Sequence, residues 1–160
     1  MTAQTPLIHP APQPRRVLAV TIPGPPVGKG RPRVANRGGR AMAYTPKRTR
    51  AWEAMAVKEI LRHWHRDPID CPAQITVVAV HQRPKRLMRK KDPTCRMWHP
   101  SKPDTDNVGK AAADAIQTAG VICDDARLCR WSLLDVYTAI GEAPCVEITV
   151  ALLPEFPDAR

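Results

Sequence analysis

A small group of carboxylates has the residue types and spacing of a cation site. Asp104 and Asp106 stand one residue apart in the stretch PDTDNVGK, and the adjacent pair Asp124 and Asp125 follows shortly after. Like charges held close together repel, and a bound divalent cation is one way to offset that repulsion. Carboxylate oxygens are hard ligands, so the preferred ion is Mg²⁺, with Mn²⁺ as an alternative.

The same carboxylates have a structural interpretation. An Asp at the start of a helix commonly caps free N–H groups and interacts favourably with the helix dipole. Two such residues in a D-x-D arrangement, followed by an Asp-Asp pair, are more than capping requires. Asp104 and Asp106 form one site with Asp125 only if the sheet topology brings the returning chain beside them.

Lys110 lies four residues after Asp106, on the same face of a predicted helix. It could form a surface ion pair with Asp106 or Asp114, worth about 0.3–0.5 kcal/mol. It could equally hold a phosphate group or stabilise a transition state. The residues themselves leave both roles open.

Charge is distributed unevenly along the chain. The formal net charge is +10, from 25 Lys and Arg against 15 Asp and Glu. Before Asp104 there are 21 basic and 5 acidic residues, and from Asp104 onward there are 4 basic and 10 acidic residues. Two basic runs lie in Gly/Pro-rich segments, at 28–50 and 82–103. This asymmetry indicates a polyanionic partner, and nucleic acid is the leading candidate.

The elements that must position these residues follow from periodicity and breakers. Short apolar runs predict four strands, at Arg16–Ile22, Ala73–Gln82, Arg130–Ala139 and Cys145–Leu153. Helical spacing predicts two helices, from Pro46 to about His65 with Thr45 as N-cap, and from Asp104 or Thr105 to Thr118, ended by Gly120. We expect long loops at Gly28–Tyr44 and Arg83–Pro103, and a closing hairpin around Gly141. The predicted fold is α+β, a single mixed four-stranded sheet with two main helices packed on it.

The length indicates one domain. We expect a Pro-rich disordered tail at residues 1–14, a folded domain at 15–154 and a C-terminal tail at 155–160. No apolar run approaches the length of a membrane helix, and the N-terminus lacks a secretory signal. The five cysteines are widely spaced without C-x-x-C, which indicates a reducing compartment. The expected location is therefore cytoplasmic, with no membrane partner.

Two other interpretations of the motifs are weaker. Cys95, His99, Cys123 and Cys129 could be zinc ligands, but the spacing of the last two is wide for a zinc knuckle, and incidental thiols explain them better. The letters DTDNV also fit the D-x-D-x-[TV] pattern of haloacid dehalogenase-type phosphatases. In those enzymes the first Asp ends a hydrophobic strand, whereas WHPSKP precedes Asp104.

The segment KPDTDNVGKAAADAI, followed by AGVICDDARL, resembles the signature of the RusA family of crossover-junction endodeoxyribonucleases. GKGRPR and YTPKRTRAWE resemble the N-terminal part of many bacterial and phage members, so the resemblance extends from about Pro23 to Tyr137. It implies a small cytoplasmic, nucleoid-associated homodimer, bacterial or phage-encoded, that binds four-way (Holliday) junctions. It implies Mg²⁺-dependent hydrolysis of phosphodiesters in two opposed strands, in recombination and repair, without an organic cofactor.

Matched position by position, the resemblance implies that Asp104, Asp106 and Asp125 are catalytic metal ligands and that Lys110 is the functional lysine. Asp124 is a further candidate ligand. Many members have a Lys before an aromatic in the next strand, where this chain has Asp135. The strand Cys145–Leu153 is a candidate edge for dimerisation. The predicted DNA contacts are basic residues of the two runs, namely Lys29, Arg31, Arg33, Arg37, Arg40, Lys47, Arg48, Arg83, Lys85, Arg86, Arg89, Lys90, Lys91 and Lys102.

Two other functions stay open at this point. A general branched-DNA nuclease acting on flaps or forks would need the same carboxylates and the same basic loops. A non-catalytic nucleic-acid-binding module would keep the basic loops and use the carboxylates only as caps and surface charges.

Overall fold

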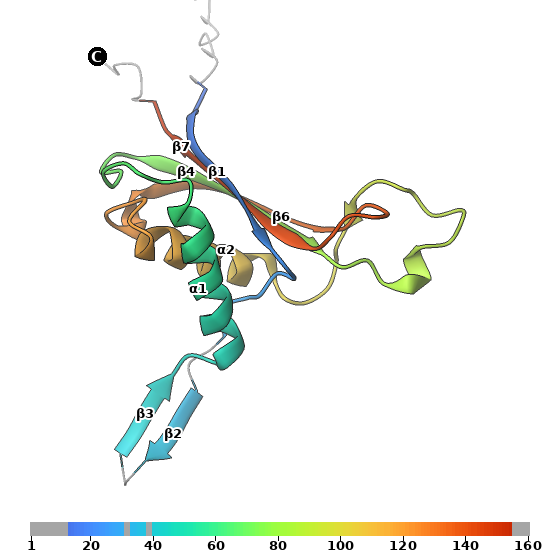
Figure 1. The fold of residues 1–160 in the computed structure, drawn as a ribbon, viewed down its shortest axis with the longest axis horizontal. Helices are drawn as coiled ribbons and strands as arrows, with labels where there is room; N and C mark the ends of the chain where they lie inside the picture. The colour runs from blue at the N-terminus through green and yellow to red at the C-terminus, as the bar shows by residue number, and fades with distance from the viewer. Residues whose placement is uncertain (1–12, 31–32, 38–39, 155–160) are drawn as a thin grey trace, which may run out of the picture.

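The chain folds into a five-stranded mixed sheet with two helices against it, shown in Figure 1. A computed structural model describes residues 13–30, 33–37 and 40–154, with side chains described for 13–30 and 45–154. The elements in chain order are β1 (Arg15–Pro23), β2 (Arg33–Arg37), β3 (Arg40–Tyr44), α1 (Lys47–Leu61), β4 (Ala73–His81), η1 (Lys85–Leu87), β5 (Met97–Trp98), α2 (Thr105–Thr118), η2 (Asp125–Arg127), β6 (Leu128–Tyr137) and β7 (Cys145–Leu152).

The main sheet has the strand order β1-β7-β4-β6-β5. β4 runs parallel to β6 and antiparallel to β7, so the prediction of a mixed sheet with two helices is confirmed. The prediction of four strands is wrong, because β5 adds a fifth. β5 is only two residues long, pairing Met97 with Tyr137 and Trp98 with Val136, and so short a strand leaves no alternating pattern in the sequence.

β6 and β7 do not form the predicted hairpin, because β4 lies between them. The helix-facing residues of β4, Ala73, Ile75, Val77 and Ala79, are 0–2% exposed, as expected for a central strand. β7 is likewise flanked on both sides, by β1 and β4, so the expectation that Cys145–Leu153 offers a free edge is also wrong. Hydrophobic patterning marks strands but does not determine which strands pair.

The two helices bury their apolar faces against each other and against the sheet. α1 contributes Trp52, Ala56 and Ile60 to the core. Its predicted N-cap is wrong, since Pro46 occupies that position one residue after Thr45, and the helix ends at Leu61 rather than near His65. α2 matches its predicted bounds, and Gly120 follows its end with a φ of +71°, a conformation that favours glycine.

Both predicted long loops contain regular structure. The backbone of 33–44 forms the β2–β3 hairpin, which extends beyond the start of α1 in Figure 1, so the prediction of an irregular Gly28–Tyr44 loop is wrong there. Residues 83–103, hereafter the arm, contain η1 and β5 and project from the other end of the sheet. Residues 1–12 of the predicted N-terminal tail and all of the C-terminal tail lie outside the described residues. In the part of the chain that the structure describes, no helix is long and apolar enough to cross a bilayer.

The packing of α2 generates a stability prediction. Ile116 is fully buried, so Ile116→Ala should lower the free energy of unfolding by about 2–5 kcal/mol, through lost burial and the cavity left behind. Ile140 is 47% exposed, and Ile140→Ala should change it by no more than about 0.5 kcal/mol. Urea unfolding followed by circular dichroism measures both values. Equal effects would show that α2 does not pack as described.

Candidate functional site

The start of α2 places the first two predicted carboxylates. Asp104 occupies the N-cap position with extended backbone (φ −69°, ψ 140°), and Asp106 lies in the first turn. Both residues are exposed. Among the described residues, the Asp104 side chain forms no capping hydrogen bond, so the capping interpretation does not account for it.

Asp106 and Asp125 line the same pocket, of about 540 Å³. The chain leaves α2, turns at Gly120 and enters η2, which returns Asp125 alongside the helix. Asp114, Lys29 and Lys110 line this pocket as well, so it gathers three carboxylates and two amines. The topology therefore supplies much of the proximity on which the sequence hypothesis depends.

Asp104 faces a neighbouring pocket, of about 350 Å³, which it shares with His99, Ser101, Lys102 and Asp135 among others. Asp104, Asp106 and Asp125 are all described, and they do not form a group with donor oxygens within 4.8 Å of one another. A three-carboxylate ligand set would need the exposed side chain of Asp104 to rotate toward the larger pocket. That set stays a prediction.

Asp124 has a structural role of its own. Its carboxylate accepts a hydrogen bond from the backbone N–H of Ala126 at 2.8 Å and so caps η2. Capping fixes the turn that presents Asp125. The assignment of Asp124 as a metal ligand stays a prediction, and this bond makes Asp125 the better candidate of the pair.

Two lysines form ion pairs with two of the carboxylates of the larger pocket. Lys110 Nζ lies 3.2 Å from Asp106 Oδ2, and the two side chains are 61% and 59% exposed. Lys29 forms an ion pair with Asp114, and its backbone N–H donates to the Asn107 carbonyl at 2.9 Å. Exposed pairs of this kind contribute little stability, so both amines can exchange partners for an incoming anion.

Gly28 allows the approach that brings Lys29 to α2. A Cβ at this position would lie 3.2 Å from the Cβ atoms of both Asn107 and Pro103, tighter than most such contacts. The absence of a side chain therefore lets the segment after β1 pack directly on the start of α2. This contact explains why a glycine precedes the lysine.

Comparison with protein families shows which family has this fold and these pocket residues. The family model described as Endodeoxyribonuclease RusA matches residues 23–151, which covers most of the chain and every element that lines the two pockets. The chain belongs to the RusA family. No curated protein matched the chain. The resemblance stated from the motif is thus confirmed, and family membership implies an endodeoxyribonuclease, a hydrolase that resolves Holliday junctions.

RusA family nucleases are typically divalent-metal dependent, and the larger pocket has suitable donors for such an ion. Mg²⁺ takes oxygen ligands and is commonly held by one or two carboxylates while keeping several waters. Asp106 and Asp125 supply two carboxylates that are exposed and face one pocket. The donor set fits Mg²⁺ without requiring a closed cage of protein ligands.

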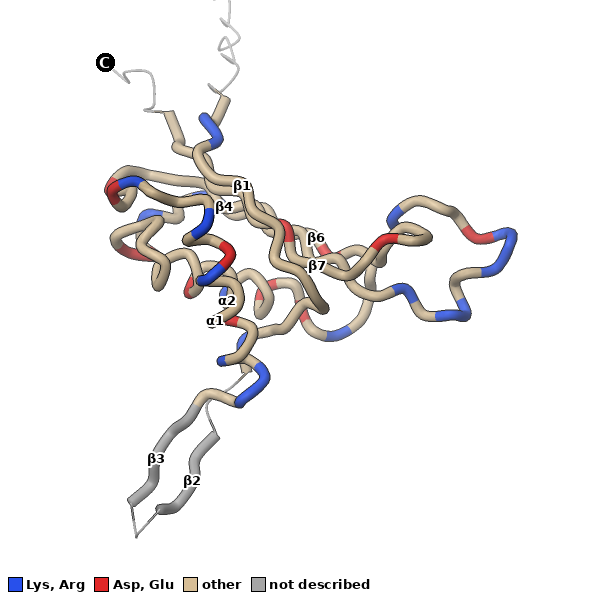
Figure 2. Tube along the Cα trace, in the orientation of Figure 1, with Lys and Arg blue, Asp and Glu red and all other residues tan. Residues whose placement is uncertain are grey.

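The predicted DNA contacts of this RusA-family chain lie mostly on its projecting parts. Figure 2 shows the basic residues of the arm distributed around its outer loop. The following are exposed: Lys29, Lys47, Arg48, Lys85, Arg86, Arg89, Lys90, Lys91 and Lys102. The side chains of Arg31, Arg33, Arg37 and Arg40 lie outside the described residues, so their assignment stays a prediction.

Arg83 differs from the rest of this set, because it is 2% exposed. Its guanidinium donates to the carbonyls of Thr138 at 2.8 Å and Pro93 at 2.5 Å, and also to that of Cys95. With its donors directed at backbone oxygens, Arg83 holds the base of the arm and is not available to a phosphate. The expectation that it contacts DNA is therefore corrected to a structural role.

Arg96 forms a second anchor, on the returning half of the arm. It bonds the carboxylates of Glu142, in the turn between β6 and β7, and of Glu147 in β7. This contact lowers the pKa of Glu142 below its ordinary value, because the guanidinium stabilises the charged carboxylate. Arg83 and Arg96 together fix both sides of the arm to the sheet, so its basic outer loop is presented on an ordered base.

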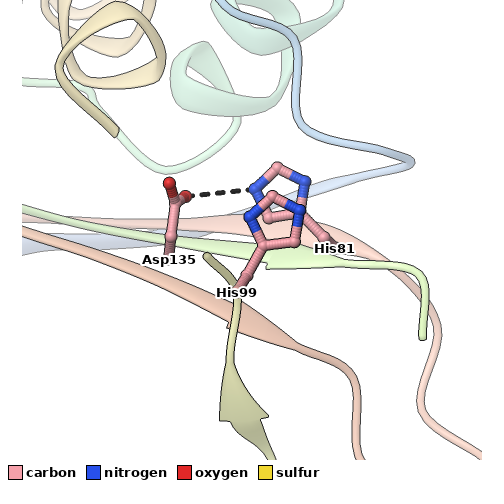
Figure 3. A group of neighbouring side chains, drawn as sticks. All are labelled: His81, His99 and Asp135. Atoms are coloured by element: carbon pink, nitrogen blue, oxygen red, sulfur yellow. Dashed lines mark hydrogen bonds and ion pairs between the residues drawn. The ribbon is translucent and has the colours of Figure 1, made fainter. Parts of the chain in front are cut away.

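One group of polar residues was missed by the sequence analysis. His81 at the end of β4, His99 after β5 and Asp135 in β6 meet beside the smaller pocket (Figure 3). They come from three elements that are distant in sequence, and no local spacing links them. The one sequence feature that drew attention to this group was Asp135, which stands where many RusA family members have a Lys. The alternative zinc set is different: within the described residues, Cys95, His99, Cys123 and Cys129 do not assemble.

The anchoring role of Arg83 is testable. Arg83→Met keeps an unbranched side chain of similar reach but leaves three backbone carbonyls without their donor, so the free energy of unfolding should fall by about 1.5–3 kcal/mol. Limited proteolysis should cut the arm faster in this variant. Arg86→Met, at an exposed neighbour in η1, is the matched control and should change neither quantity appreciably. An equal loss in the two variants would contradict the anchoring role.

Proposed function

We propose that this protein is a Mg²⁺-dependent endonuclease that resolves four-way DNA junctions by paired phosphodiester hydrolysis. The observation that carries the proposal is the pocket in which Asp106 and Asp125 lie with Lys29 and Lys110, in a chain of the RusA family. Carboxylates that bind a cation, next to amines that bind phosphate, are the two components that metal-assisted phosphoryl chemistry needs.

The chain's own residues have separate tasks in this chemistry. Asp106 and Asp125 would hold Mg²⁺, with Asp104 joining them after rotation and Mn²⁺ as an alternative ion. When bound, Mg²⁺ lowers the pKa of water and neutralises charge on the scissile phosphate. Lys110, one helical turn from Asp106, would exchange its ion pair for a phosphate oxygen and stabilise the charge that develops there. Lys29, which lines the same pocket, would contact that phosphate or its neighbour.

DNA affinity would come from surfaces other than the pocket. The arm and the start of α1 present exposed cations on projecting parts of the fold, where they can follow phosphates. Contacts to phosphate position the protein without reading sequence. This division of roles suits an enzyme that recognises the shape of a branch rather than a particular base sequence.

A homodimer would match the symmetry of the substrate. A four-way junction offers two equivalent strands, and a two-fold assembly presents one pocket to each of them. Paired cuts of this kind convert a junction into two nicked duplexes, which is the step that recombination and repair require. Because β7 already pairs with β1 and β4, the surface that joins two protomers would lie elsewhere.

The first test separates catalysis from binding. Asp106→Asn should abolish cleavage of a synthetic four-way junction in Mg²⁺ while leaving junction binding within about threefold, because affinity depends mainly on phosphate contacts made elsewhere. Asp67→Asn is a matched control at an exposed position away from the pocket. Cleavage is read on denaturing gels and binding by fluorescence anisotropy. Normal cutting by Asp106→Asn would refute the metal assignment.

The same assay, run on four-way, forked and linear DNA with and without Mg²⁺, distinguishes the remaining functions. Preferential cutting of the junction at symmetric positions supports the proposal. Equal cutting of forks would make the protein a general branched-DNA nuclease. Binding without any cutting would indicate a non-catalytic module. In such a module the carboxylates would act only as caps, but the Asp104 side chain makes no capping hydrogen bond.

The second test concerns the arm. The junction affinity of the Asp106→Asn protein should fall steeply as the salt concentration rises. In a plot of log affinity against log salt concentration, each phosphate contact should contribute about −0.9 to the slope. Replacing both Lys90 and Lys91 with Ala should reduce that slope by up to about 2. Lys58→Ala, at an exposed position on α1, should leave it unchanged. An unaltered slope in the double variant would exclude these arm residues from the DNA interface.

A further inference from the structure

Three potential metal ligands converge at the junction of β4, β5 and β6. His81 ends β4, His99 directly follows β5, and Asp135 lies in β6. One donor atom from each residue lies within 4.8 Å of the other two. His81 Nε2 is 3.0 Å from Asp135 Oδ1. Figure 3 shows a ring nitrogen of each histidine on the side facing the Asp135 carboxylate.

The environment of these side chains indicates that the group is incomplete. The side chains of His81 and Asp135 are only 9% and 8% exposed. His99 Nδ1 is buried, and it has no hydrogen-bond partner among the described residues. A buried polar atom normally has a partner, so one without a protein partner calls for a water molecule or an ion to satisfy it. Burial also lowers the pKa of His99, because desolvation disfavours the charged imidazolium.

We propose that His81, His99 and Asp135 form a binding site for a divalent transition-metal ion, of which Zn²⁺ is the best match. Imidazole nitrogens prefer borderline ions such as Zn²⁺, and two histidines with one carboxylate are a common three-ligand set that leaves a further position open. This chemistry differs from the oxygen donors of Asp106 and Asp125, which suit Mg²⁺. The site does not depend on the proposed nuclease function.

A second shell of contacts orients the carboxylate. The Thr105 hydroxyl donates to Asp135 Oδ2 at 2.7 Å, which leaves Oδ1 directed at His81. The backbone N–H of His99 donates to the carbonyl of Asp135 at 3.1 Å and fixes the end of β5 against β6. Outer contacts of this kind are typical of metal-binding sites, where they fix the orientation of each ligand.

Metal binding requires one local adjustment. The rings of His81 and His99 are stacked, with centroids 3.7 Å apart and planes at 8°. Two parallel rings cannot both direct a lone pair at one ion, so the His99 ring must turn about its Cβ–Cγ bond, a torsion with a broad energy profile. The adjoining pocket of about 350 Å³ provides space for this rotation and for a water molecule as fourth ligand.

An ion at this site would join three parts of the structure. It would attach the returning end of the arm, through His99, to β4 and β6. Through Asp135 and Thr105 it would reach the first turn of α2, between Asp104 and Asp106. The arm and the start of α2 would therefore be held in a fixed relation by metal ligation, in addition to the contacts of Arg83 and Arg96.

Cobalt(II) absorption tests the site without any reference to nuclease activity. The full-length protein is freed of metal and titrated with Co²⁺, whose visible bands are intense in a four-coordinate site with imidazole ligands and weak with water and carboxylates. We expect an intense band that one equivalent of Zn²⁺ removes. His99→Phe keeps a ring to stack on His81 but lacks nitrogen, and should abolish the band. His65→Ala, at an exposed histidine, should not affect it.

Further variants make the outcome decisive. Asp106→Asn should retain the band, which separates this site from the proposed Mg²⁺ ligands, so either can fail without the other. Thr105→Val should weaken Co²⁺ binding by about 10–100-fold, through loss of the bond to Asp135. Circular dichroism checks that each variant is folded. If His99→Phe does not fold, His81→Gln is used in its place. Absence of an intense band, its persistence in His99→Phe, or its loss in Cys95→Ser but not in His99→Phe would overturn the proposal.

Discussion

The close packing of α2 against the sheet is the constraint on which the rest of the structure depends. Seven residues of α2 are buried, and five of them are Gly or Ala, namely Gly109, Ala111, Ala112, Ala113 and Ala115. Small residues let the helix approach closely, which leaves its start little freedom to shift. Asp104, Thr105 and Asp106 are therefore presented at fixed positions, on either side of the point where the helix begins. Because η2 packs against the same helix, Asp125 is located by the same contact.

Charge separation in the molecule follows from this arrangement. The carboxylates of the larger pocket lie close to the body of the fold, along and beside α2, whereas six exposed cations lie on the arm and three in the first turn of α1 (Figure 2). Lys29 and Lys110 lie at the pocket itself, where they occupy ion pairs that water screens. An incoming phosphate and a divalent ion can exchange partners with these pairs at small cost, since exposed pairs contribute little stability. Two of the three carboxylates in the pocket are thus paired with amines that the substrate can also contact.

Much of this site could be predicted from the sequence, and the rest could not for physical reasons. The bounds of α2, the D-x-D spacing and the basic runs are local properties, so periodicity and composition reveal them. The placement of Asp125 depends on how the chain returns past α2, and pairing of β4 with both β6 and β7 depends on competition between strands, neither of which a local pattern encodes. Arg83 shows a different limit. Its sequence context is that of a surface cation, and only the path of the arm shows that backbone carbonyls surround its guanidinium.

Asp135 connects the smaller pocket to the start of α2. Many RusA family members have a Lys near this position, whereas this chain places a carboxylate beside His81 and His99. A carboxylate at 135 instead accepts from Thr105 and pairs with His81, so both of its oxygens are used. His81, Asp135 and Thr105 therefore form one hydrogen-bonded unit, in which loss of Asp135 would leave polar groups of the other two without their partner. Thr105 belongs to the first turn of α2, so its bond to Asp135 also helps to hold the start of the helix, where Asp106 of the larger pocket lies.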